Sequence, residues 1–194
     1  MTHIPIYTIG HGNRSLDEFI ELLQRYHIAF LIDIRSQPYS RYNPQFSKAA
    51  LEKSIPQHNT RYVFMGDTLG GRPADETCYL NGHVDYVKVR EKAFFQQGMA
   101  RLRTAWEKQL HVALMCSEMK PQECHRSKLI GNALIEQHIA VAHIDELGAC
   151  KEQQAVNNLL LGGQATLFAE LPLVEVNGKV GRARKKVKSF GEST

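Results

Sequence analysis

The sequence predicts an α/β domain with a mainly parallel, Rossmann-like sheet of about five strands and helices on both faces. Strand and helix patterns alternate as far as residue 144, which is typical of a parallel sheet. Residues 4–34 contain two short apolar runs separated by an amphipathic segment, and a strand, helix and strand within about 30 residues form a βαβ unit. The 43% hydrophobic and 23% charged residues are ordinary for a globular protein.

The first βαβ unit has clear boundaries. Residues 4–9 are apolar and β-branched and end in Gly10, which predicts a strand that leads into a turn. Ser15 and Glu18 have the spacing of a capping box, and the apolar positions that follow at helical spacing predict a helix up to Tyr26. Residues 29–34 then predict a second buried strand.

Two long loops follow, and each is a candidate part of an active site. Residues 35–46 are rich in Pro, Ser, Asn and Arg and residues 66–82 are rich in glycine, and long loops after strands are often functional. Between these loops we expect a short helix over residues 47–55 and a third strand over residues 62–65.

The remaining segments continue the alternation and then weaken it. Gly98 separates two amphipathic stretches, residues 84–95 and 99–108, so we expect two helices or one broken helix. The later segments, each named with its expected structure, are 112–115 (central strand), a helix from near Cys124, 141–144 (strand), 152–161 (helix) and 173–180 (hairpin at Asn177-Gly178). We therefore divide the chain into an α/β domain over residues 1–147 and a C-terminal extension over residues 148–194.

Composition narrows the class of protein. No apolar run is long enough to span a membrane, and residues 1–10 lack the features of a signal peptide, so we expect a cytoplasmic protein with no membrane partner. The four cysteines form no C-x-x-C pair, which indicates reduced thiols rather than disulfides or a zinc ribbon. Five basic residues crowd residues 182–188, so this tail is either a solvated terminus or a nucleic-acid attachment.

Chemistry-bearing side chains gather where the central strand ends. Cys116 follows the apolar run directly, and Glu118, Cys124, His125 and Arg126 come within ten residues of it. Ligands bind beyond the carboxyl ends of the strands in such sheets, and a thiol near Arg, His and a helix N-terminus has the setting that lowers its pKa. The alternative interpretation of Cys116 is a small buried residue at a strand end.

Four arginines are expected at the same edge of the sheet. Arg35 follows the second strand, Arg41 and Arg72 lie in the two long loops, and Arg126 begins the late helix. Such a cleft suits a phosphate, a sulfate-like group or a nucleic-acid backbone. Asp33, two residues before Arg35, is either an acid or orienting carboxylate of the site or the partner of Arg35 in a structural ion pair.

Two cofactor hypotheses use the same region. The loop from Gly10 to Ser15 resembles the dinucleotide fingerprint, but Ser15 stands where the third glycine is required and His11 would crowd the pyrophosphate. A metal site could use Cys116, Cys124, His125 and His11, although simultaneous ligation by the adjacent Cys124 and His125 is awkward and no familiar spacing supports it. We therefore expect no cofactor and no metal and keep a metal-dependent enzyme as an alternative.

The sequence resembles the domain of unknown function 488 family over residues 4 to 147. The resemblance rests on the segments YTIGH, LIDIR with PYSR, LGG, CSE and CHR. The residues that match the family pattern are His11, Asp33, Arg35, Arg41, Cys116, Glu118, Cys124, His125 and Arg126. The family has no established activity to carry over, so the resemblance supports the fold and the motif positions.

A more distant similarity links the chain to rhodaneses and cysteine phosphatases, in which a strand ends in a nucleophilic Cys before an anion-binding loop. Those enzymes have Arg six positions after the Cys, whereas this chain has Gln122 there and its Arg at position 126. Cys124 is accordingly a rival nucleophile or a resolving thiol.

These observations favour a cysteine-dependent enzyme that acts on an anionic substrate by group or sulfur transfer. In this hypothesis Cys116 is the nucleophile, and His125 with Glu118 or Asp33 transfers protons. The substrate-binding residues would be His11, Arg35, Arg41, Arg72 and Arg126. The alternatives are a noncatalytic nucleic-acid-binding module and a metal-dependent enzyme on the same residues.

Overall fold

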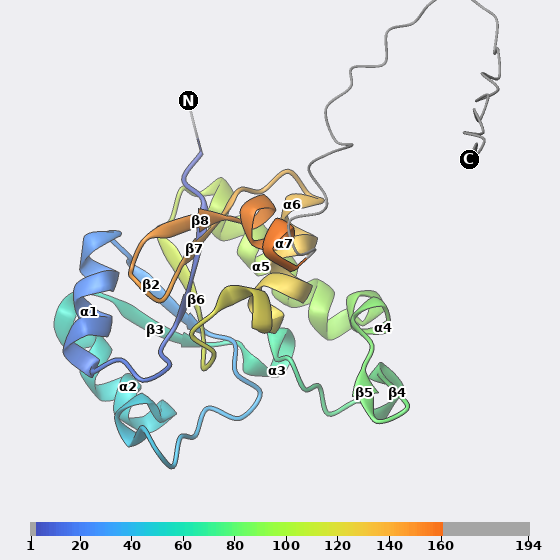
Figure 1. The fold of residues 1–194 in the computed structure, drawn as a ribbon, viewed down its shortest axis with the longest axis horizontal. Helices are drawn as coiled ribbons and strands as arrows, with labels where there is room; N and C mark the ends of the chain where they lie inside the picture. The colour runs from blue at the N-terminus through green and yellow to red at the C-terminus, as the bar shows by residue number, and fades with distance from the viewer. Residues whose placement is uncertain (1–2, 161–194) are drawn as a thin grey trace, which may run out of the picture.

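A computed structural model describes residues 3–160 and contains a six-stranded sheet in the order β3-β2-β6-β1-β7-β8 (Figure 1). Five strands are parallel, and β8 runs antiparallel to β7 at one edge. The strands are β1 (Ile6–Gly10), β2 (Phe30–Asp33), β3 (Arg61–Phe64), β6 (Val112–Cys116), β7 (Val141–Ile144) and β8 (Cys150–Glu152); a separate hairpin pairs β4 (Tyr79–Leu80) with β5 (His83–Val84). The predicted fold class is confirmed, with β8 as an additional strand.

Helices cover both faces of the sheet, as expected. On one face, α1 (Leu16–Arg25) and α2 (Lys48–Ser54) pack on Ala113 and Met115 of β6. On the other face, the helical segments pack on Val112 and Leu114. They are α3 (Gly66–Leu69), α4 (Tyr86–Glu91), α5 (Ala93–Glu107), the π-helical segment Arg126–Gly131 and α6 (Asn132–Ile135); α7 (Gln153–Leu160) follows β8.

Local signals explain where the first helix begins. The Glu18 amide donates to Ser15 Oγ at 3.2 Å, and Glu18 Oε2 accepts from the Ser15 amide at 2.8 Å. Both halves of the predicted capping box are therefore present, and they satisfy N–H groups that have no partner inside the helix.

The break between α4 and α5 lies at Lys92 and not at Gly98, where we expected it. Lys92 has extended backbone angles, whereas Gly98 lies inside α5. A Cβ on Gly98 would approach Leu69 Cδ2 of α3 to 2.6 Å. This glycine therefore allows two helices to approach closely and does not end one.

Parallel pairing brings the critical strand ends to one edge of the sheet. Gly10 is the register partner of Cys116, and Asp33 is the partner of Met115. As predicted, Cys116, His11, Asp33 and Arg126 belong to the same edge. Because β6 lies between β1 and β2, Cys116 occupies the middle of that edge.

A buried polar chain connects the end of the described structure to the sheet. His143 of β7 contacts Thr8 Oγ1 and Gln153 Oε1, each at 2.7 Å, and Gln153 Nε2 donates to Ser127 Oγ at 2.9 Å. These contacts join β1, β7, α7 and the π-helical segment.

The predicted hairpin at residues 173–180 and the basic run at residues 182–188 lie outside the described residues, and the division at residue 147 stays a prediction. No helix within residues 3–160 has both the length and the apolar character needed to cross a membrane.

Candidate functional site

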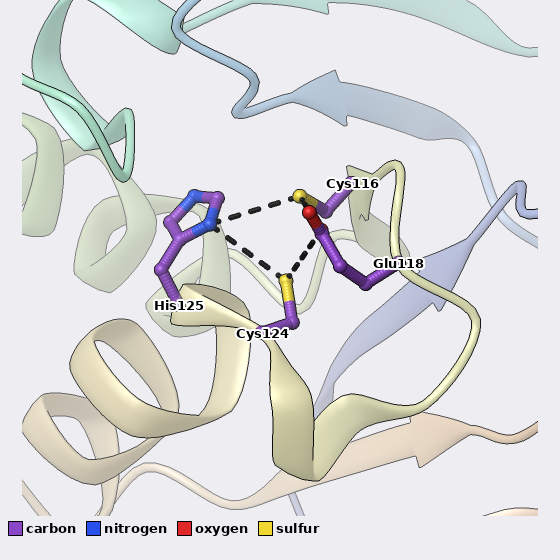
Figure 2. Close-up of side chains that lie close together, drawn as sticks. All are labelled: Cys116, Glu118, Cys124 and His125. Carbon is purple, nitrogen blue, oxygen red and sulfur yellow. Dashed lines mark hydrogen bonds between the residues drawn. The ribbon is translucent and has the colours of Figure 1, made fainter.

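Two thiols, a carboxylate and an imidazole converge at the carboxyl end of the central strand (Figure 2). Cys116 ends β6, Glu118 lies in the loop that follows, and Cys124 and His125 directly precede the π-helical segment. One donor atom from each of the four side chains lies within 4.8 Å of all the others. The structure thus brings together four of the five residues predicted to be catalytic.

Hydrogen bonds fix the orientation of this cluster. The thiols of Cys116 and Cys124 donate to Glu118 Oε2 at 2.7 and 3.1 Å. His125 Nδ1 lies 3.7 Å from each sulfur, and His125 Nε2 lies 3.2 Å from the carbonyl oxygen of Ile34. Because a carbonyl oxygen only accepts, Nε2 carries a proton, and in the neutral ring Nδ1 presents its lone pair to the sulfurs.

The electrostatics of the cluster differ from our expectation for Cys116. Its pKa is raised well above the ordinary value, first by its hydrogen bond with Cys124 and then by burial, which outweigh the lowering effect of His125. The expected lowering of this pKa was therefore wrong. Burial opposes ionisation of Glu118, but hydrogen bonds from both thiols lower the pKa of this carboxylate overall. Burial lowers the pKa of His125, but the contact of its ring with Cys116 raises this pKa overall.

The cluster forms one wall of an open cavity of about 340 Å³. The volume is within the range of about 300–1,000 Å³ that is typical of small-molecule sites. Its lining comes from five segments of the chain: Arg35, Ser36, Gln37, Gly71, Arg72, Tyr86, Cys116, Ser117, Glu118, Glu123, Cys124 and His125. The cavity is thus large enough to hold a small molecule.

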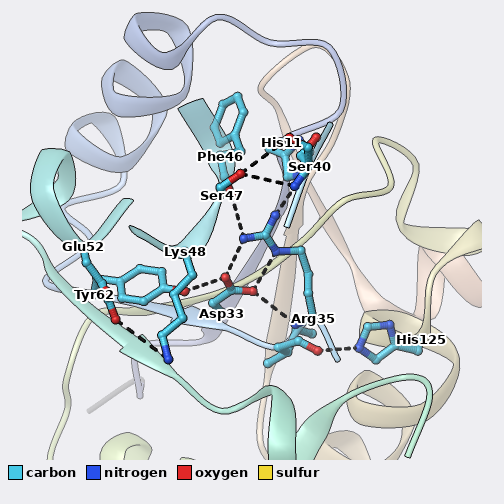
Figure 3. A network of polar contacts seen from close by, with 11 residues as sticks. His11, Asp33, Arg35, Ser40, Phe46, Ser47, Lys48, Glu52, Tyr62 and His125 are labelled. Carbon is cyan, nitrogen blue, oxygen red and sulfur yellow. Dashed lines mark hydrogen bonds and ion pairs between the residues drawn. The ribbon is translucent and has the colours of Figure 1, made fainter. Parts of the chain in front are cut away.

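Asp33 and Arg35 form a buried ion pair beside this cavity (Figure 3). Arg35 Nε and Nη2 donate to the two carboxylate oxygens of Asp33 at 2.8 and 2.6 Å, and Nη2 also donates to the Phe46 carbonyl oxygen at 2.8 Å. Tyr62 donates to the same carboxylate at 2.6 Å. Asp33 is fully buried and does not line the cavity, so its contacts support the structural alternative.

The other predicted arginines have different positions. Arg72 lines the cavity with an exposed side chain and takes part in no ion pair among residues 3–160. Arg41 is exposed but does not line the cavity. Arg126 is fully buried, donates from Nη2 to the Met119 carbonyl oxygen at 2.8 Å, and has no partner within the described residues for Nε and Nη1.

Gly10 is required by the close packing around Arg126. A Cβ at this position would overlap the carbonyl oxygen of Glu118 and lie 2.7 Å from Arg126 Nη1. The loop from Ser117 to Met119 therefore packs directly on the end of β1, with the guanidinium beneath it. Gly12 has a φ of 48°, in the left-handed region that favours glycine, whereas Gly10 ends strand β1 and is not among the glycines with positive φ.

His11 lies outside the four-residue cluster. Its ring stacks on Phe46 with centroids 4.5 Å apart, and its Nδ1 bonds the Gly12 carbonyl oxygen at 3.0 Å. Burial, the largest effect, lowers its pKa, and Nε2 faces Arg35 Nη1 at 3.4 Å. His11 thus supports Arg35 and does not line the cavity.

Six lining residues were not predicted to be site residues: Ser36, Gln37, Gly71, Tyr86, Ser117 and Glu123. Ser36 Oγ accepts from the Arg72 amide at 2.9 Å and connects the two long loops. A Cβ on Gly71 would lie 2.7 Å from His125 Cγ, so this glycine lets the second loop pack on the imidazole. For Ser36, Gln37 and Gly71 the two long loops were the available signal, whereas Tyr86, Ser117 and Glu123 lie outside these loops.

The family model described as Domain of unknown function DUF488 matches residues 15–134. The chain belongs to this family. No curated protein and no solved structure gives a significant match to this DUF488 protein. Its chemistry therefore has to be inferred from the side chains at the end of β6.

Proposed function

We propose that this DUF488 protein is an enzyme that transfers or hydrolyses a group on a small anionic substrate in the cavity beside Cys116. The observation that carries the proposal is the meeting, in one open cavity of about 340 Å³, of proton-transfer groups, sulfur atoms and an arginine that forms no ion pair within residues 3–160. Groups with perturbed pKa values that lie together in a cleft indicate a functional site.

Arg72 is the best candidate for contact with the anion. Its side chain is exposed at the cavity and is free of ion pairs among the residues described, so a substrate would not have to displace a carboxylate. Arg35 already gives Nε and Nη2 to Asp33 and Phe46, and its Nη1 contacts His11 Nε2 at 3.4 Å, so Arg35 has little donor capacity left for a ligand. Ser36, Gln37 and Ser117 add hydrogen-bonding groups to the same wall.

His125 and Glu118 are suited to proton transfer. The His125 ring is held by the Ile34 carbonyl oxygen, and its free Nδ1 lies 3.7 Å from both sulfurs. Glu118 Oε2 accepts from both thiols, and these hydrogen bonds offset the effect of burial and lower its pKa. The raised pKa of Cys116 argues against a free thiolate in the bare cluster, so each sulfur must lose its proton before it can bond to a substrate or an ion.

The proposal is tested with a panel of small anions, namely inorganic phosphate, thiosulfate and p-nitrophenyl phosphate, in calorimetric binding and turnover assays. Arg72→Ala should weaken binding of the accepted anion by about tenfold, the effect of losing one charge-assisted hydrogen bond. Arg41→Ala is the matched control, because Arg41 is also an exposed loop arginine but does not line the cavity. No binding of any panel member, or equal effects of the two substitutions, would refute the proposal.

Nucleic-acid binding and a cytoplasmic location stay predictions. The first depends on residues 182–188, which lie outside the described part of the chain.

A further inference from the structure

We propose that Cys116, Glu118, Cys124 and His125 bind one zinc ion at the wall of the cavity. This inference names a cofactor for the site, and it rests on the proposed function only for the role of the ion in a reaction. The binding of the ion follows from the four side chains themselves, and their geometry, tautomer, backbone support and charge all bear on it.

The distances between donor atoms are close to those of a tetrahedral zinc site. With Zn–S bonds of about 2.3 Å and Zn–N or Zn–O bonds of about 2.0–2.2 Å, neighbouring ligand atoms lie about 3.3–3.8 Å apart. His125 Nδ1 is 3.7 Å from both sulfurs, within that range. Glu118 Oε2 is closer, at 2.7 and 3.1 Å from the sulfurs, so this carboxylate, which belongs to an exposed residue, would have to move outward to bind the ion.

His125 has the tautomer and the support of a metal-binding histidine. Its Nε2–H points to the Ile34 carbonyl oxygen at 3.2 Å, which leaves the Nδ1 lone pair directed at the centre of the cluster (Figure 2). Metal-bound histidines almost always donate their other ring N–H to a carbonyl or carboxylate in this way. The Ile34 carbonyl oxygen belongs to the backbone directly after β2, so the sheet itself holds the ring.

The backbone around Cys124 allows adjacent residues to contribute to one site. Cys124 is extended, with φ −114° and ψ 148°, whereas His125 is helical, with φ −61° and ψ −21°. This change of conformation brings both side chains to the same side, with Sγ and Nδ1 3.7 Å apart. The Arg126 amide also donates to Cys124 Sγ at 3.4 Å, a bond that would stabilise a thiolate.

The donor set selects zinc over the abundant hard cations. Magnesium and calcium require oxygen ligands, but three of these four donors are sulfur or imidazole nitrogen. Two thiolates and an imidazole are the protein ligands of a known class of catalytic zinc site, in which the fourth position is open. Here the fourth donor is an exposed carboxylate next to the cavity, so Glu118 could give way to a water molecule or a substrate.

Arg126 supplies the charge that such a centre requires. Zinc with two thiolates and a carboxylate has a net charge of −1, and a buried charge needs an opposite charge nearby. Arg126 is fully buried, and its Nε and Nη1 have no partner within residues 3–160. Its guanidinium packs against Gly10, the β1 partner of Cys116, so the buried cation lies one strand away from the proposed centre.

Zinc binding has a defined proton balance. Each thiol loses one proton as its sulfur forms a bond to zinc, so binding to the reduced protein releases two protons to the solvent and oxidises nothing. When bound, zinc acts as a Lewis acid that activates water or polarises a substrate oxygen. In that case the sulfurs of Cys116 and Cys124 are ligands rather than nucleophiles, and His125 Nδ1 is a ligand rather than a proton-transfer group.

The first experiment measures metal in the full chain purified without chelators. Elemental analysis should find about one zinc per chain, and metal-free protein should take up about one zinc with release of two protons. Reconstitution with cobalt should give a thiolate-to-cobalt charge-transfer band in the near ultraviolet and the intense visible bands of tetrahedral cobalt. These measurements use the unaltered protein, so they do not depend on whether a variant folds.

Variants then identify the ligands. Cys116→Ser and Cys124→Ser should each weaken zinc binding at least about a hundredfold and remove the thiolate band in part, whereas Glu118→Gln should weaken it about tenfold. Cys150→Ser is the matched control, because this exposed thiol lies outside the cluster. Circular dichroism of each metal-free variant tests that the fold is retained.

The zinc inference is overturned if the metal-free wild-type protein fails to bind zinc, or if Cys116→Ser and Cys150→Ser bind it equally well. Its failure is separable from failure of the proposed function. Zinc binding without any effect of Arg72→Ala on the anion panel would leave the metal site standing and refute the anion proposal. Anion turnover that depends on Arg72 in a protein unable to bind zinc would do the reverse.

Discussion

His143 lies in the middle of the buried polar chain between β1 and α7, and its protonation should weaken the fold in acid. The ring is fully buried. Its Nε2 donates to Gln153 Oε1, so its Nδ1 accepts from the Thr8 hydroxyl. Burial, the largest effect, and the positive charge of Arg126 lower the pKa of His143 to about 4, although the bond to Gln153 raises it.

The difference between the pKa of His143 in the folded and in the unfolded chain determines how the free energy of unfolding changes with pH. The unfolded chain takes up a proton on His143 below about pH 6.5, but the folded chain does so only near pH 4. The free energy of unfolding therefore keeps its full value above pH 6.5 and falls by up to about 1.4 kcal/mol per pH unit as the pH is lowered. The total loss between pH 6.5 and 4 should be about 3 kcal/mol.

The assay compares the wild-type protein with His143→Gln in urea unfolding at pH 4.5 to 7.5, with a chelator present so that metal binding does not contribute. The variant should be less stable than the wild type at pH 7.5, because glutamine cannot replace both ring contacts. The difference between the two free energies of unfolding should shrink by about 2–3 kcal/mol toward pH 4.5. Parallel stability curves would show that His143 does not titrate differently in the folded state.

Three further substitutions test other parts of the structure. Gly10→Ala should lower stability by about 1–3 kcal/mol and weaken zinc binding, because the new methyl group would displace the Glu118 carbonyl oxygen; thermal melts and metal analysis check both effects. Asp33→Asn should cost about 3–5 kcal/mol in urea unfolding, since it leaves the buried charge of Arg35 without its partner, and a cost below 1 kcal/mol would contradict this account. Ser15→Ala should cost about 1 kcal/mol by the same measurement, because it removes the side-chain cap of α1.

Local sequence patterns predicted most of the helices and strands, because contacts between residues close in the sequence determine where these elements begin and end. The capping box at Ser15 uses atoms three residues apart, and the apolar run before Cys116 is buried on both faces of a parallel sheet. In contrast, β8 has the sequence CKE, which carries no apolar signal. It is a strand because β7 offers an unpaired edge, and that edge exists only after the sheet has formed.

A glycine in an amphipathic stretch can mark the end of a helix or a close contact between two helices, and Gly98 is of the second kind. Glycine inside an amphipathic stretch often marks the end of a helix, and the sequence contains nothing that identifies Leu69 as its neighbour. The observed break at Lys92 places an extended residue between two helices without help from glycine or proline. Lys92 forms an ion pair with Asp75 at 2.8 Å, a contact that no local sequence pattern indicates.

The candidate site illustrates why the identity of residues was easier to predict than their roles. The segment from Cys116 to Arg126 contains the reactive side chains, and parallel topology alone was enough to put them at one edge of the sheet. Arg126 follows His125 directly in the sequence. Arg126 is nevertheless buried beneath the loop from Ser117 to Met119, whereas His125 lies beside the cavity. Residues along a helix point in different directions, so a run of three functional residue types at a helix start cannot all face one ligand.

Cys124 and His125 are adjacent in the sequence, but their backbone conformations differ. Their adjacency argued against joint ligation only on the assumption that both residues share one regular conformation. The helix starts between them, so an extended residue is followed by a helical one, and their donor atoms come within 3.7 Å of each other. A pair of potential ligands that spans the first residue of a helix should therefore be tested as a chelating unit before its spacing is used to exclude a metal.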